Sequence, residues 1–221
     1  MKLLGLDIEK TYIDRKKIEI MKTNIILIGF MGAGKTEIGR TLAKNEGFNF
    51  IDIDYLIEKN EGAAIAEIFK RKGESYFRNL ETEILKEIDK NKPDISKTSE
   101  KYIYREKQAG DSKHNIIISG KDKPSVISTG GGAPAFNGNM KLLKNIGTVI
   151  YLKADARTIY ERIKSETHRP VLGADGFTLK SVSDKLSERE KIYEKADIII
   201  YTEGLTMQAV AEEIEFFFNF C

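Results

Sequence analysis

The sequence GFMGAGKT at residues 29–36 constrains the fold of this chain more than any other stretch. It fits the pattern G-x-x-x-x-G-K-[ST], and an almost wholly apolar run, Asn24 to Ile28, stands directly before it. Such a run is typical of a parallel strand that is buried on both faces. Ile38 and Leu42 recur at helical spacing after it. A strand, a glycine loop and a helix N-terminus in this order form a nest of backbone N–H groups that binds anions, so the stretch predicts a nucleotide-binding P-loop.

The residues of this loop have distinct expected contacts with a nucleoside triphosphate. Lys35 is expected to reach the β- and γ-phosphates, and the Thr36 hydroxyl is expected to bind Mg²⁺. The other residues of this stretch predicted to bind ATP are Gly32, Ala33, Gly34 and Glu37. The alternative is an ordinary glycine turn, and the flanking strand and helix patterns argue against it.

The composition bounds the class of protein. A chain of 221 residues suits one domain with a full core. With 36 basic against 34 acidic residues, nucleic acid is not an expected partner. No apolar run approaches the roughly 20 residues of a membrane span, and the first residues lack a signal-peptide core. The single cysteine, Cys221, suits a reducing compartment. We therefore expect a soluble, cytoplasmic, globular protein with no membrane contact. The expected oligomeric state, which composition does not decide, is a monomer.

Two segments have the character of additions to this domain. Residues 1–22 precede the P-loop strand, and Met21 would itself make a plausible chain start. We expect an N-terminal extension there, either a misassigned start or a poorly ordered arm. The segment at about 89–124 is polar and rich in lysine, and its two β-like runs indicate an inserted loop or a protruding β-hairpin. The main domain is expected to span residues 23–221.

Residues 48–54 read FNFIDID, a second predicted strand with two carboxylates at its end. Asp52 and Asp54 are two residues apart, so on an extended backbone both side chains project to the same side. Ligands bind beyond the carboxyl ends of strands in open α/β sheets. Asp52 is therefore predicted to help hold Mg²⁺, and Asp54 to bind an acceptor hydroxyl and take its proton. The alternative is that Asp54 caps a helix that starts at Tyr55. The P-loop favours the functional interpretation.

Three glycines follow the next predicted strand, Val126 to Thr129. Gly130, Gly131 and Gly132 expose backbone N–H groups and let a ligand approach the main chain closely. A tight turn, which is the alternative, needs only one or two glycines. The run therefore predicts part of a binding pocket.

The rest of the chain alternates strand and helix patterns. Two more strands, at 148–152 and 197–201, bring the predicted number to five, and helical spacing recurs at 55–60, 65–71, 75–88, 186–195 and 207–218. This alternation indicates an α/β fold. Residues 165–178 break the pattern with glycines and a proline, as either a mobile lid over the nucleotide or a plain connector would.

In this order and at this spacing, the motifs resemble those of the shikimate kinase family. The resemblance runs from about Met21 to the C-terminus and is interrupted by the segment at 89–124. It rests on GFMGAGKT (29–36), FIDID (50–54), Phe77-Arg78, GGGA (130–133), RPVL (169–172), and Arg189 with Tyr193 one helical turn later. By itself, Arg78 would be interpreted as a surface arginine.

The resemblance implies an activity and a fold. Shikimate kinases transfer the γ-phosphate of ATP to the 3-hydroxyl of shikimate, with Mg²⁺, on the way to chorismate and the aromatic amino acids. The implied architecture is a three-layer α/β sandwich of the P-loop NTPase type, with a five-stranded parallel sheet, a lid and a substrate-binding segment. Its small-molecule partners would be ATP and shikimate.

The resemblance also assigns roles to individual residues. It implies that Arg78 and Arg189 bind the shikimate carboxylate, that Asp54 binds its hydroxyls, and that Gly130, Gly131 and Gly132 line the pocket. Arginine forks suit a carboxylate, which agrees with this assignment.

On the nucleotide side, Arg169 in the lid would contact the phosphates and Arg162 would pack on adenine. Lys35, Asp54 and Arg169 would together form the catalytic set. The third predicted strand ends without a Walker-B aspartate, which leaves Mg²⁺ to Thr36 and Asp52.

Two other functions use the same P-loop. A related small-metabolite kinase, such as a gluconate kinase, gives no reason for the combination of FIDID, Arg78, three glycines and Arg189. A nucleotide-binding protein without transfer activity would normally have lost Asp54, Arg78 or Arg189, and all three stand in this sequence.

Overall fold

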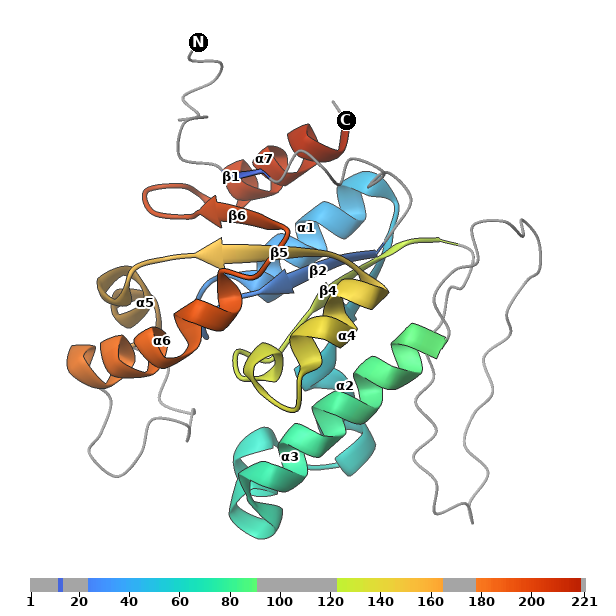
Figure 1. Cartoon of the computed structure of the whole chain (residues 1–221), viewed down its shortest axis with the longest axis vertical. Helices are drawn as coiled ribbons and strands as arrows, with labels where there is room; N and C mark the ends of the chain where they lie inside the picture. Colours follow the sequence, from blue (N-terminus) through green and yellow to red (C-terminus); the bar gives the residue numbers. More distant parts are fainter. Residues whose placement is uncertain (1–11, 14–23, 91–122, 165–177, 220–221) are drawn as a thin grey trace.

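The computed structural model describes residues 12–13, 24–90, 123–164 and 178–219. Their centre is one sheet with strand order β1-β6-β5-β2-β4-β3, and its last five strands are parallel. The parallel strands are β2 Asn24–Ile28, β3 Asn49–Asp52, β4 Ser125–Ser128, β5 Gly147–Lys153 and β6 Ile198–Tyr201. Helices cover both faces of the sheet (Figure 1). The predicted three-layer α/β fold with a five-stranded parallel sheet is therefore confirmed.

A sixth strand, β1 (Tyr12–Ile13), comes from the segment predicted to be an N-terminal extension. It pairs with β6 in the antiparallel direction, with Tyr12 opposite Ile199. The other residues of that extension lie outside the described ranges, as do residues 91–122 of the predicted insert and 165–177 of the predicted lid. What was expected of those segments stays a prediction.

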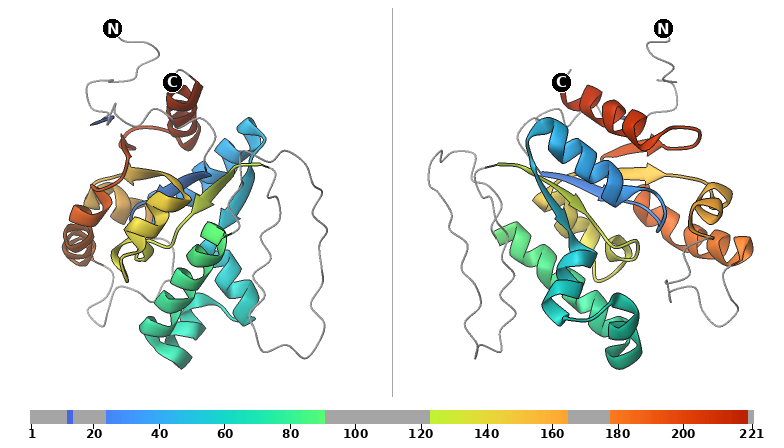
Figure 2. Two further views of the ribbon diagram at one scale, coloured as in Figure 1. Left: turned by 45° about the vertical axis from the view of Figure 1, so that its right-hand side comes forward. Right: turned by 180° about the vertical axis from the view of Figure 1, so that it is seen from behind.

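The sheet divides the core into two layers, because successive side chains of a strand point to opposite faces. Ile25 and Leu27 of β2 pack in the layer that contains α1 (Lys35–Glu46) and α7 (Met207–Asn219). Ile26 and Ile28 pack in the layer on the opposite face. Figure 2 shows the helices on the two sides of the sheet. That layer contains α2 Ile53–Glu61, α3 Ile65–Lys90, α4 Asn139–Ile146, α5 Ala156–Ile163 and α6 Leu179–Tyr193. No helix within the described ranges is long and apolar enough to cross a membrane.

The strand β3 is shorter than predicted. It ends at Asp52, and α2 begins at Ile53 and not at Tyr55. Asp52 is the N-cap, because its Oδ1 accepts a hydrogen bond from the Tyr55 backbone N–H at 3.2 Å. Asp54 therefore lies in the first turn of a helix. The expectation that both acids project from one strand, with Asp54 as the possible cap, is wrong.

The long helix α3 is broken at Gly73, where φ is 80° and ψ is 167°. Glycine adopts this backbone conformation without strain, whereas other residues rarely do. The break separates the two helical stretches that were predicted at 65–71 and 75–88. The second part carries a buried apolar stripe against the sheet, and with it Arg78 and Glu81.

Candidate active site

The P-loop connects the carboxyl end of β2 to the N-terminus of α1. Gly34 is the N-cap of α1 and has a φ of 88°, in the left-handed region that favours glycine. A Cβ atom built on Gly34 would lie 2.5 Å from Sδ of Met207, the first residue of α7. The backbone angle favours glycine at the start of α1, and a side chain there would also displace the Met207 side chain.

Lys35 is folded onto the loop. Its side chain is buried, and Nζ donates hydrogen bonds to the carbonyl oxygens of Gly29 at 3.0 Å and Phe30 at 2.9 Å. These carbonyl groups are neutral, so a phosphate anion arriving at the loop offers the ammonium a stronger, charge-assisted hydrogen bond.

The two predicted Mg²⁺ ligands lie together. Thr36 Oγ1 donates to Asp52 Oδ2 at 2.7 Å, and Ser128 Oγ at the end of β4 is 3.5 Å from the same hydroxyl. Among the described residues no group of three or more His, Cys, Asp and Glu side chains could hold a metal ion. One hydroxyl and one carboxylate fit Mg²⁺, which keeps several waters and binds phosphate oxygens. Ser128 was not predicted as a site residue. It is the last residue of β4, the strand whose end lacks a Walker-B aspartate.

The central glycine of the 130–132 run lies against the P-loop. A Cβ atom on Gly131 would lie 3.2 Å from the backbone nitrogen of Met31 and 3.4 Å from the carbonyl oxygen of Gly29. The backbone of this turn and the backbone of the P-loop are therefore in direct contact.

Gly130 faces two carboxylates. A Cβ atom built on it would lie 2.1 Å from Glu81 Oε1 and 2.7 Å from Asp54 Oδ1. Only a hydrogen atom fits there, so the two acids converge on Gly130 from α2 and α3. Glu81 is completely buried. Burial raises its pKa to about 7, with Asp54 adding to the rise, while Arg78 and Arg189 oppose it.

Arg78 is buried and not on the surface, with only 6% of its area exposed. Its NH1 donates to Glu81 Oε2 at 2.8 Å, and its Nε and NH2 donate to Glu74 Oε1 at 3.2 and 3.0 Å. Burial by itself would lower the pKa of Arg78. The Glu81 and Glu74 carboxylates have the larger combined effect, so the pKa is raised above its ordinary value. A Cβ atom on Gly132 would lie 2.4 Å from the Arg78 Cζ. The third glycine therefore makes room for this guanidinium.

Arg189 reaches the same region from α6. Its Cζ lies 5.6 Å from the centroid of the Phe30 ring, and its charge lowers the pKa of Glu81. One turn later, the hydroxyl of Tyr193 donates a hydrogen bond to the carbonyl oxygen of Gly131. Two arginines and two acids from three helices thus meet around the glycine turn.

The remaining predicted residues are placed on the nucleotide side or lie outside the described ranges. Arg162 NH1 is 3.5 Å from the Gly32 carbonyl oxygen, and its NH2 donates to the Thr202 carbonyl oxygen at 3.2 Å. This places Arg162 beside the P-loop. Glu37 is exposed in the first turn of α1. Arg169 lies outside the described residues, so its predicted contact with phosphate stays a prediction.

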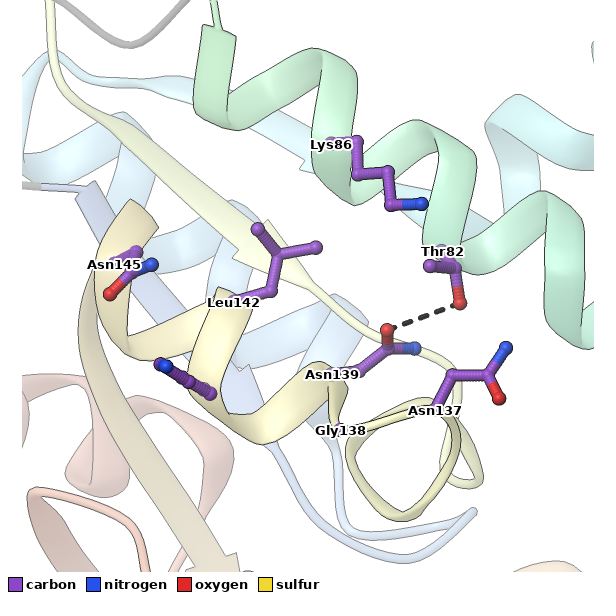
Figure 3. A pocket seen from close by; sticks show the side chains of 8 residues that line it. Thr82, Lys86, Asn137, Gly138, Asn139, Leu142 and Asn145 are labelled. Carbon is purple, nitrogen blue, oxygen red and sulfur yellow. Dashed lines mark hydrogen bonds between the residues drawn. The ribbon is translucent and has the colours of Figure 1, made fainter.

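A hollow of about 430 Å³ lies elsewhere, between α3 and α4 with the turn that precedes α4 (Figure 3). A hydrogen bond of 3.1 Å from Thr82 Oγ1 to Asn139 Oδ1 joins α3 to α4 beside the hollow. It is lined by Thr82, Lys86, Asn137, Gly138, Asn139, Lys141, Leu142 and Asn145. None of the residues predicted to bind ATP, shikimate or Mg²⁺ lines this hollow.

Sequence analysis missed Glu81, the most deeply buried acid of the site. A signal was present, since Glu81 follows Leu80 and precedes Ile84 within the apolar stripe of its helix. An acid beside such a stripe, three residues after an arginine, can be drawn into the core by an ion pair. Only the packing of α3 against the glycine turn shows that this happens.

Comparison with known proteins agrees with this geometry. A profile of the shikimate kinase family matches residues 31–118 and 112–217. The shikimate kinase of Thermodesulfovibrio yellowstonii is 40% identical over 191 residues, which are 86% of this chain and 92% of that protein. The shikimate kinase of Persephonella marina is 39% identical over 191 residues, 86% of this chain and 96% of that protein.

Among solved structures, the shikimate kinase of Acinetobacter baumannii in complex with shikimate is 31% identical and has a TM-score of 0.69. The match covers 88% of this chain and 91% of that one. The family profile spans most of the chain, and the relatives are matched over almost their full length. This chain belongs to the shikimate kinase family.

Proposed function

We propose that this protein transfers the γ-phosphate of ATP to the 3-hydroxyl of shikimate. The observation that carries the proposal is the glycine turn, which contacts the P-loop through Gly131 and the acid- and arginine-lined side through Gly130 and Gly132. Membership of the shikimate kinase family supports the same acceptor and disfavours a gluconate kinase. A phosphate donor and an anionic, hydroxylated acceptor can meet across this turn.

The acceptor side suits a small carboxylic acid. Arg78 already forms ion pairs with two carboxylates, and the Glu74 side chain is 57% exposed. A substrate carboxylate can therefore replace Glu74 on Arg78 at little cost, while the buried Glu81 keeps the guanidinium in place. Arg189 approaches from the opposite helix and supplies the second guanidinium.

Asp54 is the residue proposed to act on the acceptor hydroxyl. The shikimate oxygen forms a bond to Pγ as the bond from Pγ to the β-phosphate oxygen breaks, and Asp54 takes the hydroxyl proton. ADP leaves, and the proton passes to solvent. Phosphoryl transfer depends on such positioning and on charge neutralisation more than on covalent catalysis.

On the donor side, Lys35 would exchange its bonds to the Gly29 and Phe30 carbonyl oxygens for bonds to phosphate. Thr36 and Asp52 would hold Mg²⁺, which neutralises charge on the phosphates. Arg162 would lie beside the nucleotide, and Arg169 would contact the phosphates from the segment that follows α5.

We also propose the wider organisation that the sequence suggests. Residues 23–221 would form one kinase domain that works as a cytoplasmic monomer, with residues 1–22 as an extension and about 89–124 as an insert. Sedimentation of the purified chain, with and without nucleotide, tests the monomer.

The function is tested by ADP release from ATP in a coupled assay, with shikimate, gluconate or no acceptor in parallel. Of the three arms, we expect ADP release only in the one that contains shikimate, and we expect that release to stop when EDTA removes Mg²⁺. Release with gluconate would support the related metabolite kinase. Nucleotide binding without release in any arm would support a protein that lacks transfer activity.

A further inference from the structure

A buried tyrosine hydroxyl joins α6 to the glycine turn. Tyr193 is the last residue of α6 and has no exposed area. Its hydroxyl donates to the carbonyl oxygen of Gly131, which is 62 positions away in the sequence. A phenylalanine would fill the same apolar space, and a buried hydroxyl is costly unless it forms a hydrogen bond. The contact with Gly131 therefore gives the hydroxyl its physical reason.

The Gly131 carbonyl oxygen, which accepts this bond, belongs to the turn that lies against the P-loop. Gly131 is the middle glycine of the turn, and its backbone lies against Gly29 and Met31 of the P-loop. On either side of it, Gly130 faces Asp54 and Glu81, and Gly132 faces Arg78. A shift of the Gly131 carbonyl group thus changes both neighbours at once.

The helix that carries Tyr193 also carries Arg189, four residues earlier. Burial raises the pKa of Tyr193 to about 12, although the nearby Arg189 guanidinium lowers it. The hydroxyl is therefore protonated near neutral pH and can donate to Gly131. Arg189 is in turn near the Phe30 ring of the P-loop.

We propose that Tyr193 is a positioning residue for shikimate, whose hydroxyl fixes the 130–132 turn relative to Arg189. This inference rests on the proposed function. With the hydrogen bond in place, α6 and the glycine turn present the second arginine and the acceptor pocket as one unit. Without it, Arg189 and the pocket can shift relative to each other, and shikimate must hold them together itself.

The chain offers a matched control in Tyr151 of β5. Its ring lies 5.1 Å from that of Tyr193, and only 1% of the residue is exposed. Its hydroxyl is buried and has no hydrogen-bond partner in the described part of the chain. Tyr151→Phe and Tyr193→Phe therefore remove the same atom from two adjacent buried rings, and only one of those atoms bonds to the glycine turn.

The experiment measures KM for shikimate, KM for ATP, kcat and the melting temperature of the full chain and both variants. For Tyr193→Phe we expect the shikimate KM to rise about tenfold, the effect of one lost hydrogen bond, with the ATP KM changed by less than about twofold. For Tyr151→Phe we expect the shikimate KM and the ATP KM to equal those of the protein without substitutions.

Three results would overturn the inference. One is a Tyr193→Phe enzyme with an unchanged shikimate KM, and the second is an equal rise in both KM values, which would mean a structural role alone. The third is the same change in the Tyr151→Phe enzyme, since that hydroxyl does not touch the turn. If the unchanged protein does not phosphorylate shikimate, the proposed function fails first, and this inference fails with it.

Discussion

The two halves of the site are built in different ways. The donor half is centred on one continuous stretch, residues 29–36, whose groups are mostly backbone N–H and carbonyl groups next to Lys35, with Asp52 and Arg162 at its edge. The acceptor half gathers side chains from α2, α3 and α6 around the glycine turn, over sequence positions from Asp54 to Tyr193. A contiguous motif can be recognised from its own sequence, whereas an assembled pocket depends on the whole fold.

The halves also differ in how their charges are held. Lys35 Nζ donates hydrogen bonds to two backbone carbonyl oxygens of its own loop, and a bound phosphate would take their place. Arg78 is already paired with Glu81 and Glu74. The charge of Arg78 is therefore neutralised before substrate arrives, and the position of its guanidinium depends on the buried Glu81. The four predictions below test this difference.

The largest expected effect is on the acceptor carboxylate. Asp54→Asn keeps the size of the side chain but cannot take a proton, so kcat should fall by a factor on the order of 10³. The donor half should not respond, and ATP should bind with unchanged affinity in titration calorimetry. Asp184→Asn, the same change on the exposed side of α6, is the control and should leave kcat unaltered. An unreduced kcat in the Asp54→Asn enzyme would mean that Asp54 does not take the hydroxyl proton.

The next prediction concerns stability and pH, through Glu81. Its pKa is raised in the folded protein to about 7 from an ordinary value of 4.5, so the folded state binds a proton more tightly than the unfolded state. The resulting stability is fully present below pH 4.5 and is lost as the pH rises towards 7. The loss is on the order of 3 kcal/mol, at about 1.4 kcal/mol per pH unit.

Glu81→Gln removes this titration. The free energy of unfolding of the unchanged protein, minus that of Glu81→Gln, should therefore fall between pH 4.5 and pH 7. Chemical denaturation across that range measures it. The groups that face Glu81 are Arg78, Asp54 and Arg189, from α3, α2 and α6. A difference that is flat with pH would mean that the pKa of Glu81 is the same in the folded and unfolded states.

The sequence alone predicted the P-loop of the donor half but missed Ser128 beside Thr36, and it predicted the acceptor half only in part. The P-loop and the five parallel strands follow from local periodicity and a contiguous motif, and the structure has them. Glu81 was missed because an acid on a helix usually faces solvent, and only tertiary packing against Gly130 buries it. The role of Asp52 as an N-cap was missed because a polar residue after a strand can either continue it or cap the next helix.

A third prediction asks whether the acceptor half needs the arginine fork itself. Arg78→Lys keeps the positive charge beside Glu81, so the fold should survive. A lysine cannot bind two carboxylates with a planar fork, and the shikimate KM should rise by about 30-fold. The ATP KM should stay within about twofold of the original value, as steady-state kinetics will show. Equal increases in both constants would contradict a carboxylate-binding role.

The smallest expected effects come from a pair of alanine substitutions, one in each half. Gly132 has an ordinary helical backbone, with φ of −91°, so alanine strains nothing there except its contact with the Arg78 guanidinium. That guanidinium is the end of a flexible side chain and can move aside. Gly132→Ala should therefore raise the shikimate KM by about tenfold through the shifted charge.

Gly34→Ala makes the same change in the donor half, where the left-handed backbone strains a residue with a Cβ atom and the Met207 side chain must move aside. A Cβ atom in that region costs about 1–2 kcal/mol, so the free loop relaxes away from the conformation that binds phosphate. Restoring that conformation on binding should raise the ATP KM roughly tenfold, with the shikimate KM little affected. The two variants should thus show opposite patterns in one kinetic assay. If each raised both constants equally, the contact between Gly131 and the P-loop would couple the halves so tightly that they act as one rigid body. The separation between a motif-built donor half and a fold-built acceptor half would then describe their origin in sequence and not their behaviour.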